Sequence, residues 1–197
     1  MNAEKINLDN LTAEKVGKLF PIRIVPYNPE WKTLFEQEKV LIIKVLSEKL
    51  ALNIEHIGST SIANLVAKPT IDILIEVPKL SGKTKQVITK KLETIGYKNM
   101  HNSETEKKMT FGKGYDLGFV NVQTYHAHIR EKGNLLQDEI YFRDYLRQNS
   151  AARDEYTKLK YALAEKYQFN REKYTEGKTE FVKKITEKSV VNLEKVK

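Results

Sequence analysis

The sequence predicts an α/β (α+β) fold, in which a mixed sheet flanked by helices extends to about residue 130 and a helical half follows. Residues 70–77 alternate between two faces, with three isoleucines and a valine on one face, as expected of a half-buried strand. Apolar side chains recur at helical spacing over residues 30–50. Because strand and helix patterns are mixed along the chain, we expect a layered architecture.

Length and composition predict the domain organisation. A chain of 197 residues with 40% hydrophobic residues and a mean hydropathy of -0.53 can bury one sizeable core. We expect residues 1–20 to form a leader with a short helix, and residues 21–197 to form a single domain.

The residue content excludes several classes of protein. With no cysteine, the chain has no disulfide, thiolate zinc site or cysteine nucleophile. It has no apolar run of about 20 residues, and its start lacks the basic and apolar segments of a secretory signal. We therefore expect a cytoplasmic protein without a membrane partner. The sequence carries no signal of oligomeric state.

The net charge of +8 comes from 34 basic and 26 acidic residues. Lysines are mixed with glutamates, as in Glu165-Lys166 and Glu187-Lys188, which is typical of solvated helix faces. No arginine-rich tract or array of lysines and aromatic residues indicates a nucleic-acid groove. Charge alone therefore identifies no partner.

The first predicted helix covers residues 12–20 and ends before a proline. Residues 22–25 are expected to form a short edge strand, followed by a turn. Asn28 then serves as N-cap, with Pro29 in the first position of a long amphipathic helix over residues 30–50.

The middle of the chain alternates strands and helices. A short strand over residues 54–57 enters a Gly-Ser turn, residues 61–65 form a brief helix or helical turn, and the strand over 70–77 ends at a proline. Residues 83–95 form a helix that Gly96 closes.

Residues 102–108 are predicted to be a loop. Strands over residues 109–111 and 119–123 flank a glycine-rich turn, and residues 125–129 form a further strand or continue the second. Helices follow over residues 137–148, 151–168 and 178–190.

A Gly-Ser turn followed by a strand aspartate is the main functional motif. Gly58-Ser59-Thr60 can present backbone N–H groups to phosphate, and Asp72 can hold the Mg²⁺ that accompanies phosphate. This is the layout of a nucleotidyltransferase site. The structural alternative is a tight turn whose serine caps a helix. Asp72 favours function, because a carboxylate in this strand needs a cation or donors.

The second carboxylate of such sites is missing. Two residues after Asp72, where it would share a metal, the chain has Leu74. Glu76 lies on the same strand face, but at about 3.3 Å per residue it is roughly 13 Å from Asp72. A two-metal centre is therefore not encoded locally.

His126 and His128 project from one strand face about 6.6 Å apart. This spacing suits two ligands of one metal, or a general base beside a phosphate-binding donor. The alternative places one histidine in the core and the other in solvent. Lys68 and Lys113 are candidates for phosphate contacts, or else solvated turn lysines.

Several separated motifs occur in the order typical of one family: Phe20-Pro21-Ile22, Tyr27-Asn28-Pro29-Glu30-Trp31, His56-Ile57-Gly58-Ser59-Thr60-Ser61, Lys68-Pro69-Thr70-Ile71-Asp72, His126-Ala127-His128, Phe142-Arg143-Asp144-Tyr145-Leu146-Arg147, Tyr156-Thr157-Lys158-Leu159-Lys160 and Tyr174-Thr175-Glu176-Gly177-Lys178. In these motifs the chain resembles the GrpB family, over about residues 20–185. That family resembles a branch of the nucleotidyltransferase superfamily, and some members are joined to dephospho-CoA kinase domains.

The resemblance implies a nucleotidyltransferase-like mixed sheet flanked by helices, with a helical C-terminal region. It places Gly58, Ser59 and Asp72 on the Gly-Ser and aspartate positions of the superfamily. It also implies that further residues of the family motifs line the same pocket: His126, His128, Arg143, Lys160, Tyr174 and Lys178. The usual Pro-Gly after the Gly-Ser-Thr stretch is replaced by Ala63-Asn64.

The leading expectation is an enzyme that transfers a nucleoside monophosphate from a nucleoside triphosphate to a small acceptor. Asp72, with His126 or His128, would position Mg²⁺, and Gly58-Ser59 with Lys68 would hold the triphosphate. Two alternatives remain open: a nucleotide- or CoA-type binding module without catalysis, and a protein with a two-histidine, one-carboxylate metal site.

Overall fold

The computed structural model describes residues 12–102, 107–115, 122–133 and 137–194. Within these ranges one mixed sheet has the strand order β1-β2-β5-β4-β3. The strands are β1 Asn53–Ile57, β2 Thr70–Val77, β3 Lys98–Asn102, β4 Lys108–Lys113 and β5 Thr124–Glu131. The central pair β2 and β5 is parallel and the other pairs are antiparallel.

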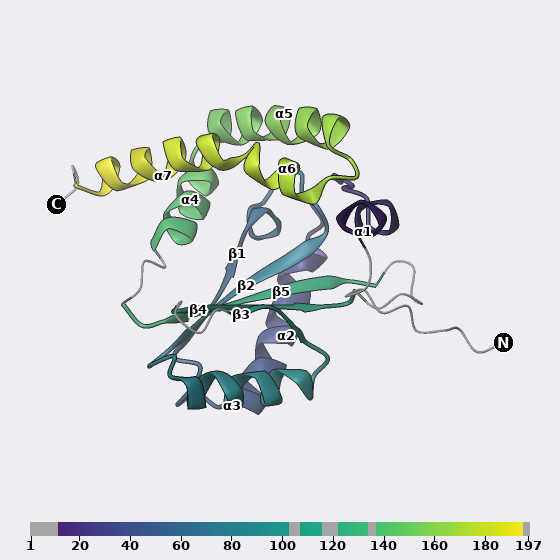
Figure 1. Ribbon diagram of the computed structural model, residues 1–197. Coiled ribbons are helices and arrows are strands. Elements are labelled where there is room, and N and C mark those ends of the chain that lie inside the picture. Colours follow the sequence, from purple (N-terminus) through teal and green to yellow (C-terminus); the bar gives the residue numbers. More distant parts are fainter. Residues whose placement is uncertain (1–11, 103–106, 116–121, 134–136, 195–197) are drawn as a thin grey trace.

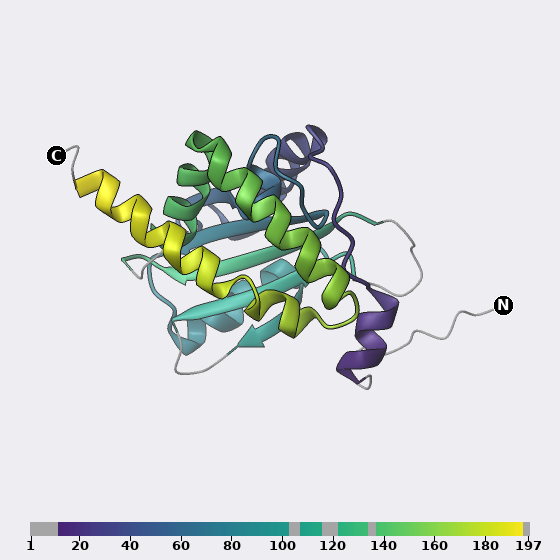
Figure 2. The same cartoon turned by 90° about the horizontal axis from the view of Figure 1, so that it is seen from above.

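Helices cover both faces of this sheet (Figure 1). One face packs against α2 Glu30–Leu46 and α3 Gly82–Glu93, and the C-terminal helices lie over the other. The C-terminal set consists of α4 Gln137–Gln148, α5 Ser150–Lys166, α6 Arg171–Glu176 and α7 Thr179–Glu194. Viewed from above, α5 and α7 cross over the strands (Figure 2). The predicted α/β fold class, with a helical C-terminal region, is confirmed.

The face toward α2 and α3 contains the main hydrophobic core. Ile71, Ile73 and Ile75 of β2 are fully buried there against Trp31 and Ile42 of α2. Burying side chains of this size stabilises the fold by about 1.5 to 3 kcal/mol each. The alternation of β2 leaves its polar side chains on the opposite face, beneath the C-terminal helices.

The C-terminal helices have a hydrophobic core of their own. Tyr156 of α5 stacks on Phe181 of α7 with ring centroids 4.9 Å apart, and Phe142 of α4 packs edge-on against both rings. Ile62 and Leu65, which follow the Gly-Ser turn, are fully buried in this cluster. The turn is therefore anchored to the helices that roof the polar sheet face. Among the described helices, none combines the length and apolar character that crossing a bilayer requires.

Three expectations near the N-terminus were wrong. Residues 22–25 form no strand, because only Val25 pairs, through an isolated bridge to Ala67. The helix expected over 30–50 ends at Leu46, where Ser47 adopts a φ of 66°. The N-cap is Pro29, one residue after the predicted Asn28, although the Asn28 side-chain oxygen accepts from the Glu30 N–H at 3.0 Å.

Other differences concern short elements. The brief helix or helical turn expected over 61–65 is a 3-10 turn, η2 Ser59–Ser61. Strand β3 and helix α6 lack a clear periodic pattern and were not predicted. The first helix, α1 Ala13–Leu19, is confirmed, whereas most of the strand predicted over 119–123 lies outside the described residues.

Candidate metal and phosphate site

Asp72, His126 and His128 converge on the sheet face that lies beneath the C-terminal helices. The Asp72 Oδ1 atom lies 3.3 Å from His126 Nδ1 and 3.5 Å from His128 Nε2. One ligand atom from each residue falls within 4.8 Å of the others. The predicted pairing of the aspartate with both histidines is therefore realised.

Strand register explains this convergence. In the parallel β2–β5 ladder, Asp72 is opposite His126 and Leu74 is opposite His128. Directly paired residues share a sheet face, and so do alternate residues of one strand. All three polar side chains consequently project to the same side. They keep 28%, 18% and 23% of their surface exposed, so the cluster is open to a ligand.

The two neighbouring histidines keep the Asp72 carboxylate ionised. Burial alone would raise its pKa, but the hydrogen bonds and charge of His126 and His128 outweigh burial and hold the pKa well below its usual range. The site thus presents an anionic oxygen between two imidazoles.

This donor set fits a divalent transition ion better than Mg²⁺. Imidazole nitrogen suits zinc, iron, nickel or copper, whereas Mg²⁺ prefers oxygen ligands in octahedral geometry. One carboxylate and two imidazoles form a metal-ligand set of the first kind. The Mg²⁺ expected from the sequence does not match a three-residue cage of this composition.

Tyr115 supports the cluster from behind His126. Its hydroxyl lies 2.6 Å from His126 Nε2, and the two rings stack with centroids 5.5 Å apart. The other ring nitrogen, Nδ1, faces Asp72. A hydrogen bond to the distal nitrogen of a metal ligand fixes its tautomer and orientation. The Arg171 guanidinium lies over the Tyr115 ring, 5.6 Å from its centroid.

The Gly-Ser turn abuts the carboxylate. Gly58 has a φ of 68°, a conformation that favours glycine, and a Cβ built there would lie 2.3 Å from Asp72 Oδ2. The absence of a side chain is therefore required by both conformation and space. Asn64, at the position of the family's usual glycine, also has a left-handed φ of 62°, which asparagine tolerates.

Lys160 of α5 joins the C-terminal helices to this turn. Its ammonium donates to Ser59 Oγ at 2.7 Å and to the Val66 carbonyl, and it lies 4.4 Å from the Tyr156 ring centroid. The residue is only 2% exposed. Burial lowers the pKa of Lys160 to about 6; Lys178 lowers it further, while Asp72 opposes the change.

Two further lysines share the electrostatic field of Asp72. Burial lowers the pKa of Lys68 to about 8, with Arg171 adding to the effect and Asp72 opposing it. Burial also lowers the pKa of Lys178, again against the attraction of Asp72, and its ammonium lies 4.5 Å from the Tyr174 ring centroid. The predicted Lys68, Lys160 and Lys178 therefore all interact electrostatically with Asp72, and the predicted Tyr174 contacts Lys178.

Three predicted residues lie elsewhere or act indirectly. Lys113 lies on the opposite sheet face, where its ammonium binds both oxygens of Glu38 at 2.8 and 2.9 Å. Arg143 binds Glu55 and Asp144 beside β1. Thr60 is buried, and its hydroxyl donates to the Thr70 carbonyl, so it supports the turn from within.

Leu74 occupies the strand position where a second carboxylate would be needed to share a metal with Asp72. It is 2% exposed and packs with Ile57 against Ile140 of α4. The position is therefore part of an apolar contact between the sheet and the C-terminal helices.

Sequence reasoning did not assign roles to Tyr115, Tyr156 and Arg171. Tyr156 stood within a family motif and Tyr115 within a glycine-rich stretch, so both had a weak signal. Arg171 had none, because its position depends on the unpredicted helix α6.

The family model described as GrpB protein matches residues 21–188. The chain belongs to the GrpB family. It is 36% identical over 163 residues to the glutamate-rich protein GrpB of Alkalihalophilus pseudofirmus, covering 82% of this chain and 92% of that protein. It is 34% identical over 176 residues to the UPF0157 protein YqkA of Bacillus subtilis, covering 87% of this chain but only 49% of YqkA.

Solved structures agree with this family assignment. The conserved protein GrpB from Enterococcus faecalis superposes with a TM-score of 0.76 at 32% identity, covering 87% of this chain and 99% of that one. A Cid1 poly(U) polymerase structure superposes with a TM-score of 0.52 at 12% identity, covering 84% of this chain and 51% of the polymerase. The second likeness shows a distant similarity to the nucleotidyltransferase fold.

Proposed function

We propose that this GrpB protein is a metal-dependent nucleotidyltransferase that moves a nucleoside monophosphate from a nucleoside triphosphate to a small acceptor. One observation carries the proposal: the Gly58 backbone abuts the carboxylate of Asp72, which is also the partner of His126 and His128. A turn suited to phosphate and a cluster suited to a metal thus form one site.

Each group has a distinct part in this reaction. Lys160, Lys68 and Lys178 supply positive charge for the triphosphate, and the Ser59 hydroxyl positions it. The acceptor oxygen attacks the α-phosphorus, pyrophosphate leaves, and the acceptor's proton passes to solvent water, because the carboxylate and both imidazoles of the cluster serve as metal ligands. A lysine buried at depressed pKa gains its proton as the phosphate arrives, so its charge develops where the substrate binds.

The metal held by Asp72, His126 and His128 would stabilise negative charge on a phosphoryl oxygen. The donor set favours a transition ion such as Zn²⁺ or Fe²⁺ as the resident metal. Mg²⁺ would enter with the triphosphate, held by oxygens of the substrate and by water.

The test is a screen of nucleoside triphosphates and small metabolites with purified protein supplied with Zn²⁺, Mn²⁺ or Mg²⁺. Mass spectrometry should detect a nucleotidylated acceptor and pyrophosphate, and Asp72→Asn should lower the rate by at least about 100-fold. Glu76→Gln, on the same strand face, is the matched control. Equal turnover by the Asp72→Asn variant would refute the assignment.

A second candidate is a nucleotide- or CoA-type binding module that has lost catalysis. The burial of Leu74 favours it, because the position offers no second carboxylate. Calorimetry separates the two candidates. Tight nucleotide binding that needs no metal, with no product formed, would favour the binding module.

A further inference from the structure

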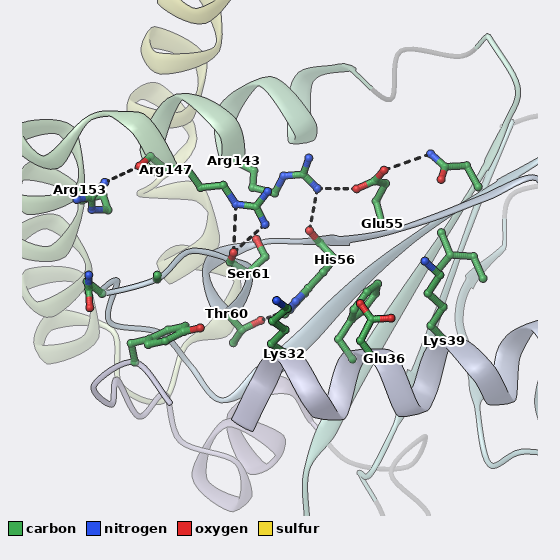
Figure 3. Close-up of a pocket in the computed structure, with 16 residues that line it drawn as sticks. Lys32, Glu36, Lys39, Glu55, His56, Thr60, Ser61, Arg143, Arg147 and Arg153 are labelled. Carbon is green, nitrogen blue, oxygen red and sulfur yellow. Dashed lines mark hydrogen bonds and ion pairs between the residues drawn. The ribbon is translucent and has the colours of Figure 1, made fainter. Parts of the chain in front are cut away.

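A cavity of about 600 Å³ lies between α2, β1 and α4, separate from the Asp72 cluster (Figure 3). Its lining includes His56, Thr60 and Ser61, which place it next to the Gly58–Ser61 turn but on the side toward α2. Neither the three clustered ligands nor Lys160 lines it.

The lining of this cavity is strongly basic. Five cationic side chains face two carboxylates: Lys32, Lys39, Arg143, Arg147 and Arg153 against Glu36 and Glu55. The cations come from helices on opposite walls, with the lysines on α2 and the arginines on α4 and α5 (Figure 3). Converging cations of this number attract an anion.

Arg143 has little capacity left for a ligand. Its Nε and Nη2 bind the two oxygens of Asp144, and its Nη1 binds both Glu55 and the His56 carbonyl. Four of the five N–H groups of a guanidinium are therefore used. Arg143 fixes α4 to β1 and forms the wall of the cavity.

Arg147 and Arg153 retain donors. Arg147 uses Nε and Nη2 on the Ser61 carbonyl and one Nη1 bond on Asp144, so two N–H groups have no partner among the described residues. Arg153 bonds only through Nη1, to the carbonyls of Leu146 and Arg147, and keeps three. Backbone carbonyls hold both guanidiniums in place, and the remaining N–H groups of each can donate hydrogen bonds to a ligand.

The floor of the cavity is aromatic. Phe35 and His56 stack with centroids 4.7 Å apart and an interplanar angle of 11°. His56 Nε2 donates to Thr60 Oγ, because that hydroxyl itself donates to the Thr70 carbonyl. Lys32 is exposed at the rim, and no hydrogen bond or ion pair joins its ammonium to the described part of the chain.

We propose that this cavity is a second binding site, for a small phosphorylated molecule whose phosphate contacts Arg147, Arg153 and Lys32 and whose organic part lies on the Phe35–His56 floor. Arginine forks match phosphate oxygens in geometry and charge. Arg147 also donates to the Ser61 carbonyl, and the Ser61 hydroxyl donates to the Gly58 carbonyl, so the cavity adjoins the turn beside Asp72. The proposal does not depend on chemistry at Asp72.

The test is calorimetric titration with pyrophosphate at low ionic strength, in a Lys160→Met background that weakens phosphate binding in the Asp72 cleft. Binding should remain in that background and should weaken about 3- to 10-fold in Lys32→Gln and at least about tenfold in Arg153→Gln. Lys90→Gln, an exposed α3 substitution with the same charge change, should bind as the background does.

Two outcomes would overturn the proposal. The first is the loss of all pyrophosphate binding in the Lys160→Met background, which would leave the Asp72 cleft as the sole site. The second is equal affinity in Lys32→Gln, Arg153→Gln and Lys90→Gln. Because the Lys32 ammonium has no hydrogen-bond or ion-pair partner among the described residues, the Lys32→Gln result stands even if Arg153→Gln fails to fold. Neither outcome would count against metal binding or nucleotidyl transfer at Asp72, because separate experiments measure those two properties.

Discussion

Asp72 and His126 are direct partners across the parallel β2–β5 ladder, and their Oδ1 and Nδ1 atoms lie 3.3 Å apart. Their closeness is therefore built into the backbone pairing and does not depend on loop conformation. Sites built on strands hold their geometry better than sites on loops.

Removing one imidazole should abolish tight metal binding. We expect His128→Ala to weaken Zn²⁺ or Mn²⁺ binding by at least about 100-fold, because one of three protein ligands is lost. Metal-binding calorimetry of the apoprotein measures the effect. Glu76→Gln should bind as the wild type does, and an unchanged affinity in His128→Ala would exclude the cluster as a metal site.

Gly58 should tolerate no side chain. Gly58→Ala introduces a Cβ 2.3 Å from Asp72 Oδ2 at a φ of 68°, so both a clash and backbone strain are expected. Denaturant unfolding should show a loss above the roughly 1 to 3 kcal/mol of backbone strain alone, because a φ of 68° with a ψ of -175° is a conformation that essentially only glycine adopts.

Two other glycines separate these contributions. Gly133→Ala has a similar φ of 78° with open space, whereas Gly82→Ala has open space and no positive φ. We expect the order of destabilisation to be Gly58, Gly133, Gly82. A Gly58→Ala loss no larger than that of Gly133→Ala would show that the Asp72 contact is not tight.

Phosphate binding beside Ser59 should be accompanied by proton uptake. Lys160, with a pKa of about 6, is mostly neutral at pH 7.5, and a nearby phosphate raises that pKa. Titration of the Lys32→Gln variant with pyrophosphate in buffers of different ionisation enthalpy measures the protons. Lys160→Met should abolish the uptake, whereas the exposed Lys158→Met should retain it. Equal uptake in Lys160→Met would assign the proton to another group.

Acid should destabilise the fold through His56. Burial lowers the pKa of His56 to about 4, although Asp72 opposes the effect, while an unfolded histidine has a pKa near 6.5. Between these values the unfolded chain binds the extra proton, so stability falls as pH drops below about 6.5 and is fully present above it. The loss reaches about 2 kcal/mol near pH 5. Urea unfolding of His56→Gln should show a smaller loss over that range, and an equal loss would contradict the assignment.

Much of the site could be predicted from local patterns. The alternation of β2 placed Asp72 on the face opposite the buried isoleucines, and the spacing of His126 and His128 placed both imidazoles on one face. Strand periodicity is a short-range property, so it can be inferred from a single sequence. The β2–β5 register is a long-range property, and only the structure could show that the two faces coincide.

Lys113 illustrates how one strand boundary changes a functional interpretation. With a strand ending at residue 111, the lysine belonged to a turn and was free to reach phosphate. Because β4 continues to Lys113, the residue shares the face of Phe111 and points into the core side. The buried Glu38 on α2 was the overlooked signal, since a carboxylate that is 3% exposed requires a cation.

The pairing of β2 with β5 also determines when the metal cluster can form during folding. Asp72 and His128 are 56 positions apart in the chain, so their strands meet only after a long loop has closed. A nascent chain that ends after β2 contains the Gly-Ser turn and the aspartate but neither imidazole. A metal ion that needs all three ligands therefore has no complete site during early synthesis. Binding of the metal would indicate that strands β2 and β5 have paired.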